Sequence, residues 1–542
     1  LRKCFEGIQA LVFDKDMAIT HMVSAEKEKV EFEYDNIKEK LIQPADSGGC
    51  VEIWLDQIQT AMRKTMAYIL DTAMEEYGIQ TPQGGRTKWL ADYPGQIVLS
   101  VTQTYWTSET TDVLNRAKEG DKDALQIYTD KLTGYLNDIV AMVRGEVPKI
   151  VRKTISALCV LDVHSRDTVQ DLVNGNICSP MDFDWLSQLR YIHIPGGESV
   201  RTGSPGSMKV QMINAERQYA YEYLGNSSRL VITPLTDRCY RTLMGAIHLD
   251  YGGAPAGPAG TGKTETVKDL GKAVATQTVV YNCSDTLDYQ AMGKFFKGLC
   301  GTGAWCCFDE FNRITLEVLS VVAQQILTIN LAKMARLDRF DFEDENIMLR
   351  RTCNIFVTMN PGYAGRQELP DNLKALVRSV AMMVPDYAQI GQIILYSMGY
   401  YQGKELAVKI VMTYKLCSEQ LSNQKHYDYG MRAVIAVLLT MGNLKRKFPD
   451  IDEDILCLRG IVDVNLPKFL APDVPLFEGI TGDLFPGVSL PVVDRSKMDP
   501  VLMEYIAEAG LQPTPYFKKK VYEIYEMMCV RHGFMVVGQA YA

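Results

Sequence analysis

A stretch near the middle of the chain combines glycines, a lysine and a hydroxyl residue in a spacing that few folds use. Residues 257–264 are Gly-Pro-Ala-Gly-Thr-Gly-Lys-Thr, which fits G-x-x-x-x-G-K-[ST] at every fixed position, and a helical pattern follows. In such a loop the glycines let backbone N–H groups surround phosphate oxygens, Lys263 reaches the terminal phosphates and Thr264 is placed to bind Mg²⁺. The positive end of the following helix favours the same anion. The stretch therefore predicts a nucleotide-phosphate site on a strand–loop–helix unit.

The size and charge of the chain limit its architecture and its partners. The chain has 542 residues, which is too many for a single core, so we expect roughly three to five domains. Its net charge is −9. This acidic balance disfavours a protein whose main role is to grip nucleic acid, although it leaves room for a local basic patch.

The cysteines and the apolar runs indicate a cytosolic protein without a membrane span. The thirteen cysteines include no C-x-x-C pair, and no histidine cluster has zinc-ligand spacing, so we expect reduced, buried thiols. Apolar runs such as 433–439 are far shorter than a bilayer span, and no secretory signal is visible. Because the chain starts with leucine and stops within a pattern, we expect it to be a fragment.

Residues 1–215 show mostly helical periodicity. Apolar residues recur at intervals of three and four over 55–69 and again over 125–143. We expect these stripes to pack helix on helix, with a partner-binding surface as the alternative. Pro148 is expected to interrupt or kink the second helix. The stretch 195–206 is rich in Gly, Ser and Pro and predicts an exposed loop.

Short apolar segments alternate with helical patterns from about residue 227. We expect strands at 278–282, 305–308, 355–359 and 380–384, and helices at 263–275, 287–299, 314–335 and 371–377. This alternation predicts a parallel sheet covered by helices on both faces. A strand at 252–255 is expected only because the loop needs one there, since its residues are not hydrophobic. Residues 339–351 predict an inserted polar hairpin.

The last part of the chain is predicted to be helical before it enters a new unit. Residues 390–447 show helical patterns, and a proline-rich stretch follows at 449–500. A helix at 521–528 and a buried strand at 534–537 then lead into Gly538 and the end of the chain. This order predicts a second phosphate loop cut before its lysine, and so a tandem module. An ordinary helix and strand are the alternative.

Two acidic residues follow a strongly apolar strand pattern. Asp309 and Glu310 come directly after Cys306-Cys307-Phe308. The carboxyl end of a parallel strand lies beside the phosphate loop, so we expect Asp309 to hold Mg²⁺ through its water shell, next to Thr264. Glu310 is expected to polarise the attacking water as a general base. The alternative is an exposed acid pair without a ligand.

Three further polar residues are candidates for contact with the nucleotide or a neighbour. Asn360 ends the strand predicted at 355–359 and is expected to contact the γ-phosphate or orient the water, although a turn-forming asparagine is the alternative. Arg432 opens a helix and is expected to reach the γ-phosphate, with a solvated arginine as the alternative. Arg378, between a helix and the strand at 380–384, is expected to point into a neighbouring module.

Taken together, these motifs resemble the first AAA+ module of a dynein heavy chain. The resemblance rests on 257–270, 307–313, 358–366 and 369–374, and upstream on 51–55 and 229–238. The segments 291–298 and 384–387 resemble axonemal rather than cytoplasmic dyneins. The likeness covers nearly the whole chain.

The resemblance implies a domain division and a fold class. Residues 1–215 would be the carboxyl-terminal part of a helical linker, and 227–390 the large α/β P-loop subdomain. Residues 391–474 would be its small helical lid, and 475–542 the beginning of a second AAA+ module, cut within its phosphate loop.

The resemblance also assigns roles to residues and implies partners. The phosphate loop would include Lys263 and Thr264. The acid that holds Mg²⁺ would be Asp309, and the catalytic acid would be Glu310. The first sensor would be Asn360, and the second sensor would be Arg432. Phosphate-loop contacts would come from Gly257, Pro258, Ala259, Gly260, Thr261, Gly262, Lys263, Thr264 and Glu265, and adenine contacts from Ile232, Thr233, Pro234 and Leu235. The cofactors would be ATP or ADP with Mg²⁺. The partners would be the other AAA+ modules of the same heavy chain and, through parts outside this chain, intermediate and light chains and microtubules, with no nucleic acid and no membrane. The location would be the cytoplasm, the cytoskeleton and the ciliary axoneme.

Two features depart from the family pattern or lie outside the chain. Ser379 stands where axonemal relatives often have proline, which affects the expected geometry at Arg378. The arginine finger for this site would come from the second module, beyond residue 542, and loss of such a finger costs roughly 10³–10⁵ in rate. The piece alone is therefore expected to bind ATP and hydrolyse it weakly.

The main hypothesis is a motor ATPase, and a nucleotide-binding structural or regulatory module with little turnover is the alternative. The Asp309–Glu310 pair favours turnover, because a silent site has no chemical need for the second acid. A GTPase is disfavoured because no N-K-x-D guanine-binding pattern is present, and a kinase because no acceptor pocket is recognisable.

Overall fold

The computed structural model describes most of the chain and divides it into two compact units. The described residues are 4–33, 48, 50–81, 85–194, 208–360, 369–424, 426–490, 496–530, 533 and 535–536. The first unit is Leu1–Pro385 and the second is Asp386–Ala542. Within the described ranges, no helix has both the length and the apolar character needed to cross a bilayer.

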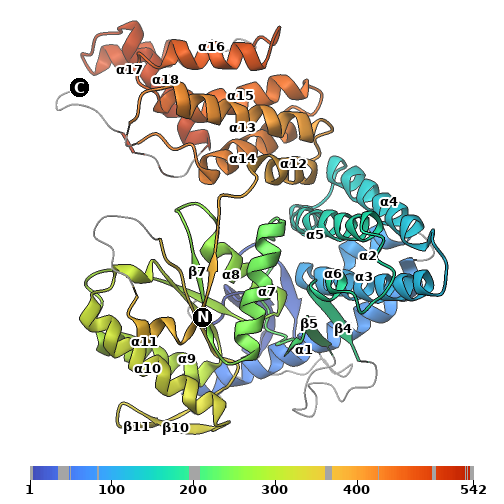
Figure 1. Ribbon diagram of the computed structural model, residues 1–542. Helices are drawn as coiled ribbons and strands as arrows, with labels where there is room; N and C mark the ends of the chain where they lie inside the picture. The colour runs from blue at the N-terminus through green and yellow to red at the C-terminus, as the bar shows by residue number, and fades with distance from the viewer. Residues whose placement is uncertain are drawn as a thin grey trace. The chain divides into compact units, whose positions relative to one another are not determined.

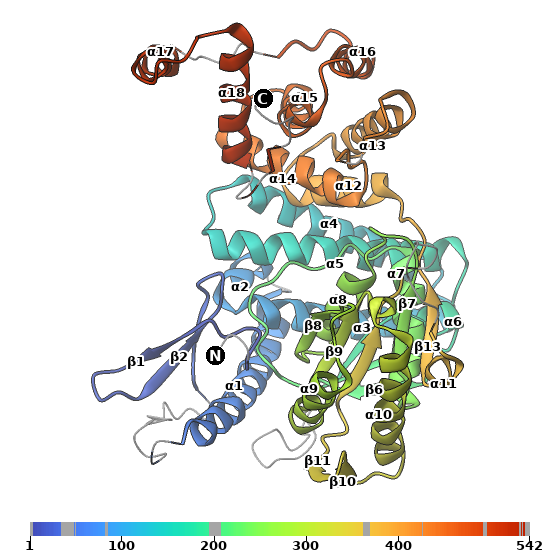
Figure 2. The ribbon, with the colours of Figure 1, turned by 90° about the vertical axis from the view of Figure 1, so that its left-hand side faces the viewer.

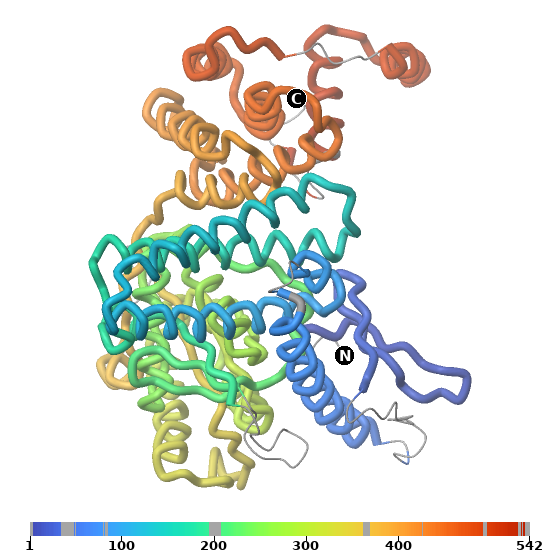
Figure 3. The backbone as a smooth tube through the Cα atoms, turned by 90° about the vertical axis from the view of Figure 1, so that its right-hand side faces the viewer, coloured from blue at the N-terminus to red at the C-terminus, as the bar shows by residue number. Residues whose placement is uncertain are grey.

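The amino-terminal part of the first unit combines long helices with two small antiparallel sheets (Figure 1). Its helices are α1 (Val51–Gln80), α2 (Arg86–Asp92), α3 (Gly95–Lys118), α4 (Ala124–Arg144), α5 (Lys149–Asn174) and α6 (Phe183–Leu186). Its strands are β1 (Ala10–Phe13), β2 (Ile19–Val23), β3 (Lys29–Glu31), β4 (Arg190–His193), β5 (Met208–Met212) and β6 (Ala215–Gln218). The β1–β2 hairpin projects beside α1 (Figures 2 and 3). The helices agree with the expected periodicity, whereas these short strands were not predicted.

The predicted apolar stripes face the interior, and proline separates two helices as expected. On α1 the side chains of Ile58, Met62 and Met66 are buried, so this stripe is core. Helix α4 ends at Arg144, and Pro148 is the N-cap of α5, which packs back on α4. Proline suits this place because it cannot donate the backbone hydrogen bond that a helix interior requires. The loop expected at 195–206 lies outside the described residues.

A five-stranded parallel sheet forms the centre of the following region. Its order is β13-β7-β12-β9-β8, and every neighbouring pair is parallel. The strands are β7 (Gly252–Ala256), β8 (Thr278–Asn282), β9 (Trp305–Asp309), β12 (Asn354–Val357) and β13 (Val377–Ala381). The parallel sheet is confirmed, including the weakly signalled β7. The strand predicted at 380–384 is wrong by three residues, because the helix before it is shorter than predicted.

Helices cover both faces of the parallel sheet. They are α7 (Pro234–His248), α8 (Lys263–Ala273), α9 (Tyr289–Thr302), α10 (Leu316–Met334) and α11 (Asp371–Lys374). One core contains residues of α9, α10 and α11 together with Cys306 and Phe308 of β9. On the opposite face, a Cβ added at Gly253 would lie 2.4 Å from Leu243 of α7, so α7 approaches the sheet closely there. The polar hairpin is present as β10 (Arg339–Phe342) and β11 (Glu345–Met348).

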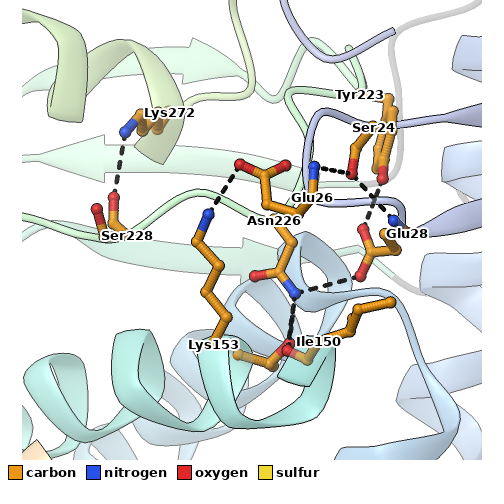
Figure 4. Close-up of polar contacts among 10 residues, drawn as sticks. Ser24, Glu26, Glu28, Ile150, Lys153, Tyr223, Asn226, Ser228 and Lys272 are labelled. Carbon is orange, nitrogen blue, oxygen red and sulfur yellow. Dashed lines mark hydrogen bonds and ion pairs between the residues drawn. The ribbon is translucent and has the colours of Figure 1, made fainter. Parts of the chain in front are cut away.

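Buried polar side chains join the amino-terminal part of the first unit to the segment that leads into the sheet (Figure 4). The Glu28 carboxylate accepts hydrogen bonds from Gly95 N at 3.0 Å, Tyr223 Oη at 2.6 Å and Asn226 Nδ2 at 3.4 Å. Glu222, the residue before Tyr223, accepts from Arg63 Nη2 of α1 at 2.6 Å and Gln277 N at 2.7 Å. Since Gln277 directly precedes β8, this carboxylate connects α1 to the edge of the sheet.

The second unit is helical. Its helices are α12 (Tyr387–Ser397), α13 (Gly403–Gln420), α14 (Met431–Lys447), α15 (Glu453–Asn465), α16 (Val474–Leu484), α17 (Met498–Glu508) and α18 (Pro515–Val530). One apolar core extends along the chain from Leu395 to Phe485. The stretch 449–500 is thus more regular than its prolines suggested, because two of them, Pro467 and Pro475, lie at the start of helical segments, where the missing N–H costs nothing. The strand predicted at 534–537 and the second loop lie outside the described residues, apart from Met535 and Val536, which are exposed and irregular.

Candidate functional site

The phosphate loop connects β7 to α8, and its backbone requires glycine. A Cβ at Gly257 would lie 2.1 Å from Met382 O, so no larger residue fits there. Gly260 and Gly262 both have a φ of 79°, a left-handed conformation that L side chains rarely adopt. Gly262 is also the N-cap of α8, so backbone N–H groups at the positive end of this helix lie at the loop.

Lys263 is held over the loop by backbone carbonyls. Its Nζ donates to Gly257 O at 2.8 Å and Pro258 O at 2.6 Å, and its side chain is 7% exposed. Ala259 lies in the turn that follows Pro258, and Thr261 donates to Pro258 O at 3.0 Å. The ammonium group is therefore positioned by the same loop that supplies the inward N–H groups.

A threonine hydroxyl and an aspartate from two separate elements meet beside the loop. Thr264 Oγ1, in the first turn of α8, donates to Asp309 Oδ1 at 2.7 Å. Thr358, just beyond β12, donates to the same oxygen at 2.5 Å. A hydroxyl and a carboxylate are the hard oxygen donors that Mg²⁺ prefers, and Mg²⁺ usually takes only one or two ligands from protein side chains. The two residues predicted to bind Mg²⁺ thus have suitable chemistry and lie next to each other.

Glu310 and Asn360 are also brought together, by strands that are neighbours in the sheet. Asn360 Nδ2 donates to Glu310 Oε1 at 3.2 Å, and Arg313 pairs with Glu310 Oε2 at 2.6 Å. Glu310 N donates to Thr358 Oγ1 at 3.1 Å, and Glu310 has a φ of 53°. Left-handed backbone in a residue other than glycine is costly and is concentrated at functional sites. Here it redirects the chain so that adjacent acids serve different partners: Asp309 faces Thr264, and Glu310 faces Asn360.

The segment expected to contact adenine forms the start of α7. Thr233 is its N-cap, Pro234 occupies the first turn, and the hydroxyls of Thr233 and Thr236 form a reciprocal capping box. Ile232 and Leu235 are half-buried. Helix α7 packs against both β7 and α8, the elements on either side of the phosphate loop. The capping box explains why threonines occupy positions 233 and 236 at the start of this helix. Contact of the segment with adenine stays a prediction.

A buried network that the sequence analysis did not identify fixes this segment to α8. Arg229 forms two parallel hydrogen bonds with Asp269, Nε to Oδ1 at 2.9 Å and Nη2 to Oδ2 at 3.0 Å. Leu230 N and Tyr240 Oη donate to the same carboxylate, at 2.9 and 2.6 Å. Burial alone would raise the pKa of Asp269, but Arg229 and these hydrogen bonds hold it below its usual value. In the sequence, Asp269 is one of several charged residues of the predicted helix 263–275, so no local pattern singles it out.

No hydrogen bond joins the other predicted residues to this cluster in the described part of the chain. Glu265 is exposed in the first turn of α8, with Lys268 Nζ 3.4 Å from its carboxylate. Arg378 was predicted between a helix and a strand, which is wrong: it is an exposed residue within β13, because that strand begins at Val377. Arg432 is in the first turn of α14, so it opens a helix as predicted, and its contact with the site stays a prediction.

One edge of the parallel sheet carries a glycine-rich phosphate loop, a lysine, a hydroxyl–carboxylate pair and a second acid. This arrangement defines the class of P-loop nucleoside-triphosphate-binding proteins. The family model described as "Hydrolytic ATP binding site of dynein motor region" matches residues 219–542, and the one described as "Dynein heavy chain, N-terminal region 2" matches residues 1–73. Since the first match covers more than half of the sequence, the chain belongs to the dynein heavy-chain family.

Relatives of axonemal type support this assignment. The chain is 54% identical to Dynein axonemal heavy chain 3 of Mus musculus over 538 residues, 99% of this chain and 12% of the relative. It is 54% identical to Dynein axonemal heavy chain 12 of Homo sapiens over 542 residues, 100% of this chain and 17% of the relative. Identity to Dynein axonemal heavy chain 1 of Homo sapiens is 51%, over 99% of this chain and 12% of the relative. The chain therefore spans less than a fifth of these relatives.

Proposed function

We propose that this chain forms the ATP-hydrolysing module of an axonemal dynein heavy chain and transmits its nucleotide state to the amino-terminal region. The observation that carries the proposal is that Thr264 bonds to Asp309 and Asn360 bonds to Glu310, next to the loop that holds Lys263. The Thr358 hydroxyl joins the two pairs. These side chains come from α8 and from the ends of two strands, so only the folded sheet brings them together.

In this proposal each side chain has a separate task. The loop N–H groups and Lys263 would bind the phosphates, and Thr264 and Asp309 would hold Mg²⁺, which when bound would supply positive charge next to the transferring phosphoryl group. Glu310 accepts a proton from the attacking water, and Asn360 orients the carboxylate. The γ-phosphoryl group then passes to that water, giving ADP and phosphate. Adenine would lie against the segment 232–235.

The route from the site to the amino-terminal region would run along α8. Its first residue is Lys263, and beyond its last turn Val274 O and Ala275 O accept from Ala220 N and Glu222 N, at 3.1 and 3.2 Å. Tyr191 Oη of β4 donates to Ala273 O at 2.8 Å. A shift of α8 on phosphate binding would therefore act directly on Tyr191, Ala220 and Glu222.

The remaining assignments concern the whole protein and are proposals from the family. Residues 1–215 would act as linker, 227–390 as the large subdomain, 391–474 as the lid carrying Arg432, and 475–542 as the start of a second module. That module would supply the arginine finger, other parts of the heavy chain would bind microtubules and the intermediate and light chains, and the protein would work in the ciliary axoneme.

The substitution Glu310→Gln in the full-length protein tests this function. The amide cannot accept the proton, so we expect ATP to stay bound while single-turnover hydrolysis falls about 10³-fold. Glu317→Gln, an exposed glutamate in the first turn of α10, is the matched control and should leave hydrolysis unchanged. If Glu310→Gln leaves hydrolysis unaffected, Glu310 is not the general base. If the unmodified site binds ATP and never hydrolyses it, the alternative of a structural or regulatory module is supported instead.

A further inference from the structure

One short segment of the chain lies between the phosphate loop and the two acids of the candidate site. Residues 358–360 directly follow β12, the strand that has β7 on one side and β9 on the other. Towards β7, Met359 N donates to Pro255 O at 3.1 Å, and Gly257 N donates to Met359 O at 3.1 Å. The backbone of this segment therefore holds the first glycine of the phosphate loop.

Towards β9, the same segment holds the turn that carries the second acid. Thr358 N donates to Phe308 O at 2.9 Å, and Phe311 N donates to Thr358 O at 3.0 Å. Glu310 lies between these two phenylalanines and has a φ of 53°. Left-handed backbone is costly in a residue that has a side chain, so it persists only where its surroundings fix it. The backbone of Thr358 provides this restraint, because it bonds to both ends of the turn.

The hydroxyl of Thr358 connects the turn to the carboxylate of Asp309. It donates to Asp309 Oδ1 at 2.5 Å and accepts from Glu310 N at 3.1 Å. These directions follow from the partners, because an ionised carboxylate can only accept and a backbone N–H can only donate. The side chain is 0% exposed, and a β-branched side chain has few χ1 rotamers, so the hydroxyl has little freedom to turn away.

Thr358 differs in one respect from Thr264, whose hydroxyl donates to the same carboxylate oxygen at 2.7 Å. Thr264 is an expected Mg²⁺ ligand, so its hydroxyl would have to serve the metal and the carboxylate together. Thr358 is not an expected ligand, so its hydrogen bond to Asp309 would be the same with and without one. A carboxylate that is oriented before the ligand arrives needs no reorganisation when the ligand binds.

We propose that Thr358 is a positioning residue for the candidate site: its hydroxyl orients Asp309 for Mg²⁺ and fixes the turn that directs Glu310 towards the attacking water. The inference rests on the proposed function, because it needs Asp309 and Glu310 in the roles assigned above. Outer partners of metal-binding side chains typically contribute about 10- to 100-fold to metal affinity or activity. Loss of this hydroxyl should therefore weaken Mg²⁺ binding and slow hydrolysis together.

Two substitutions separate the hydroxyl from the packing of the side chain. Thr358→Val keeps the shape and removes the hydroxyl, whereas Thr358→Ser keeps the hydroxyl and removes a methyl group. Thr129→Val is the control, because Thr129 is also buried and its hydroxyl donates within α4, to Leu125 O at 2.9 Å. A role in packing alone would make Thr358→Ser at least as harmful as Thr358→Val.

The readout is hydrogen exchange of the peptide that contains 257–264, in the full-length protein with increasing Mg²⁺. The nucleotide is adenylyl imidodiphosphate, an ATP analogue that resists hydrolysis. We expect Thr358→Val to raise the Mg²⁺ concentration at half-protection about tenfold, and Thr358→Ser and Thr129→Val to leave it within about twofold. Exchange of the β12 amides without nucleotide checks that each variant is folded. Single-turnover hydrolysis of ATP at saturating Mg²⁺ should also be about tenfold slower in Thr358→Val alone.

Asp309→Asn distinguishes failure of this inference from failure of the proposed function. If Asp309→Asn raises the Mg²⁺ concentration and Thr358→Val does not, Thr358 has no positioning role and the proposed function stands. If neither variant raises it, Asp309 does not hold Mg²⁺ and both proposals are wrong. Equal losses in Thr358→Val and Thr358→Ser would contradict the role of the hydroxyl. If Thr358→Val does not fold, Thr358→Ala and Thr358→Ser differ by the hydroxyl oxygen alone, and the same separation of about tenfold is expected.

Discussion

The phosphate-site edge of the sheet and the junction around Glu28 both depend on polar side chains, but they use them differently. At the phosphate site Lys263 and Thr264 come from the start of a helix and Asp309 from a strand end, and they gather where a ligand would lie. At the junction, Glu28 receives three donors from the chain itself and is 6% exposed. The first arrangement is organised for a ligand, whereas the second is organised for rigidity. Substitutions should therefore affect binding in one region and stability in the other.

The Asp269 carboxylate lies on α8, the helix that begins with Lys263, and its substitution should give the largest effect. Asp269→Asn would leave Arg229 buried without its counter-charge, and we expect the free energy of unfolding of the first unit to fall by about 3 kcal/mol. Hydrogen exchange of the α8 amides in the full-length protein would measure it. The control is Asp121→Asn, which removes an exposed partner of Arg116 and should cost under about 1 kcal/mol.

The same substitution should change the pH dependence of stability. The pKa of Asp269 is lowered in the folded state, so its contribution is present above the ordinary aspartate pKa and is lost as pH falls through the folded value. Acidification should therefore destabilise the unmodified protein more than Asp269→Asn. A parallel loss of stability in both proteins would show that the ion pair is not the cause.

Lys263→Met should separate binding from stability at the phosphate site. Removing the ammonium group is expected to weaken ATP binding at this site about 100-fold, with little change in the unfolding midpoint without nucleotide. Fluorescent-nucleotide titration of the full-length protein, with Lys294→Met on the exposed face of α9 as control, would measure this. If the fold is lost together with binding, the lysine has a structural role that the comparison does not assign to it.

Glu28→Gln should show the opposite behaviour and a smaller effect. The amide replaces one acceptor oxygen by a donor, so one of Gly95 N, Tyr223 Oη and Asn226 Nδ2 loses its partner, at a cost of about 2 kcal/mol. Hydrogen exchange at the start of α3 should accelerate, and nucleotide affinity should stay the same, as in the exposed control Glu119→Gln. A change in affinity without a change in stability would contradict the division drawn here.

Much of the α/β region was predictable because its signals are local. The glycines and lysine of 257–264 specify a turn and a helix start, and the apolar segments before Asp309 and Asn360 specify strands. Parallel strands place their carboxyl ends at one edge, so the meeting of Asp309 with Thr264 followed from pattern alone. Strand β7 was the exception: Gly252–Ala256 lacks a hydrophobic signal because close approach of α7 and β13 demands small residues there.

What the sequence determined by itself is the phosphate loop, the order of strands and helices in the α/β region, and the residues that follow each strand there, because turn chemistry and hydrophobic periodicity act over a few neighbouring positions. Only the tertiary structure decided that Arg229 binds Asp269 and that Glu28 binds Tyr223. These pairs join segments tens to hundreds of residues apart. Their energy comes from burial and exact partner geometry, which no local pattern records and which arise when the elements pack.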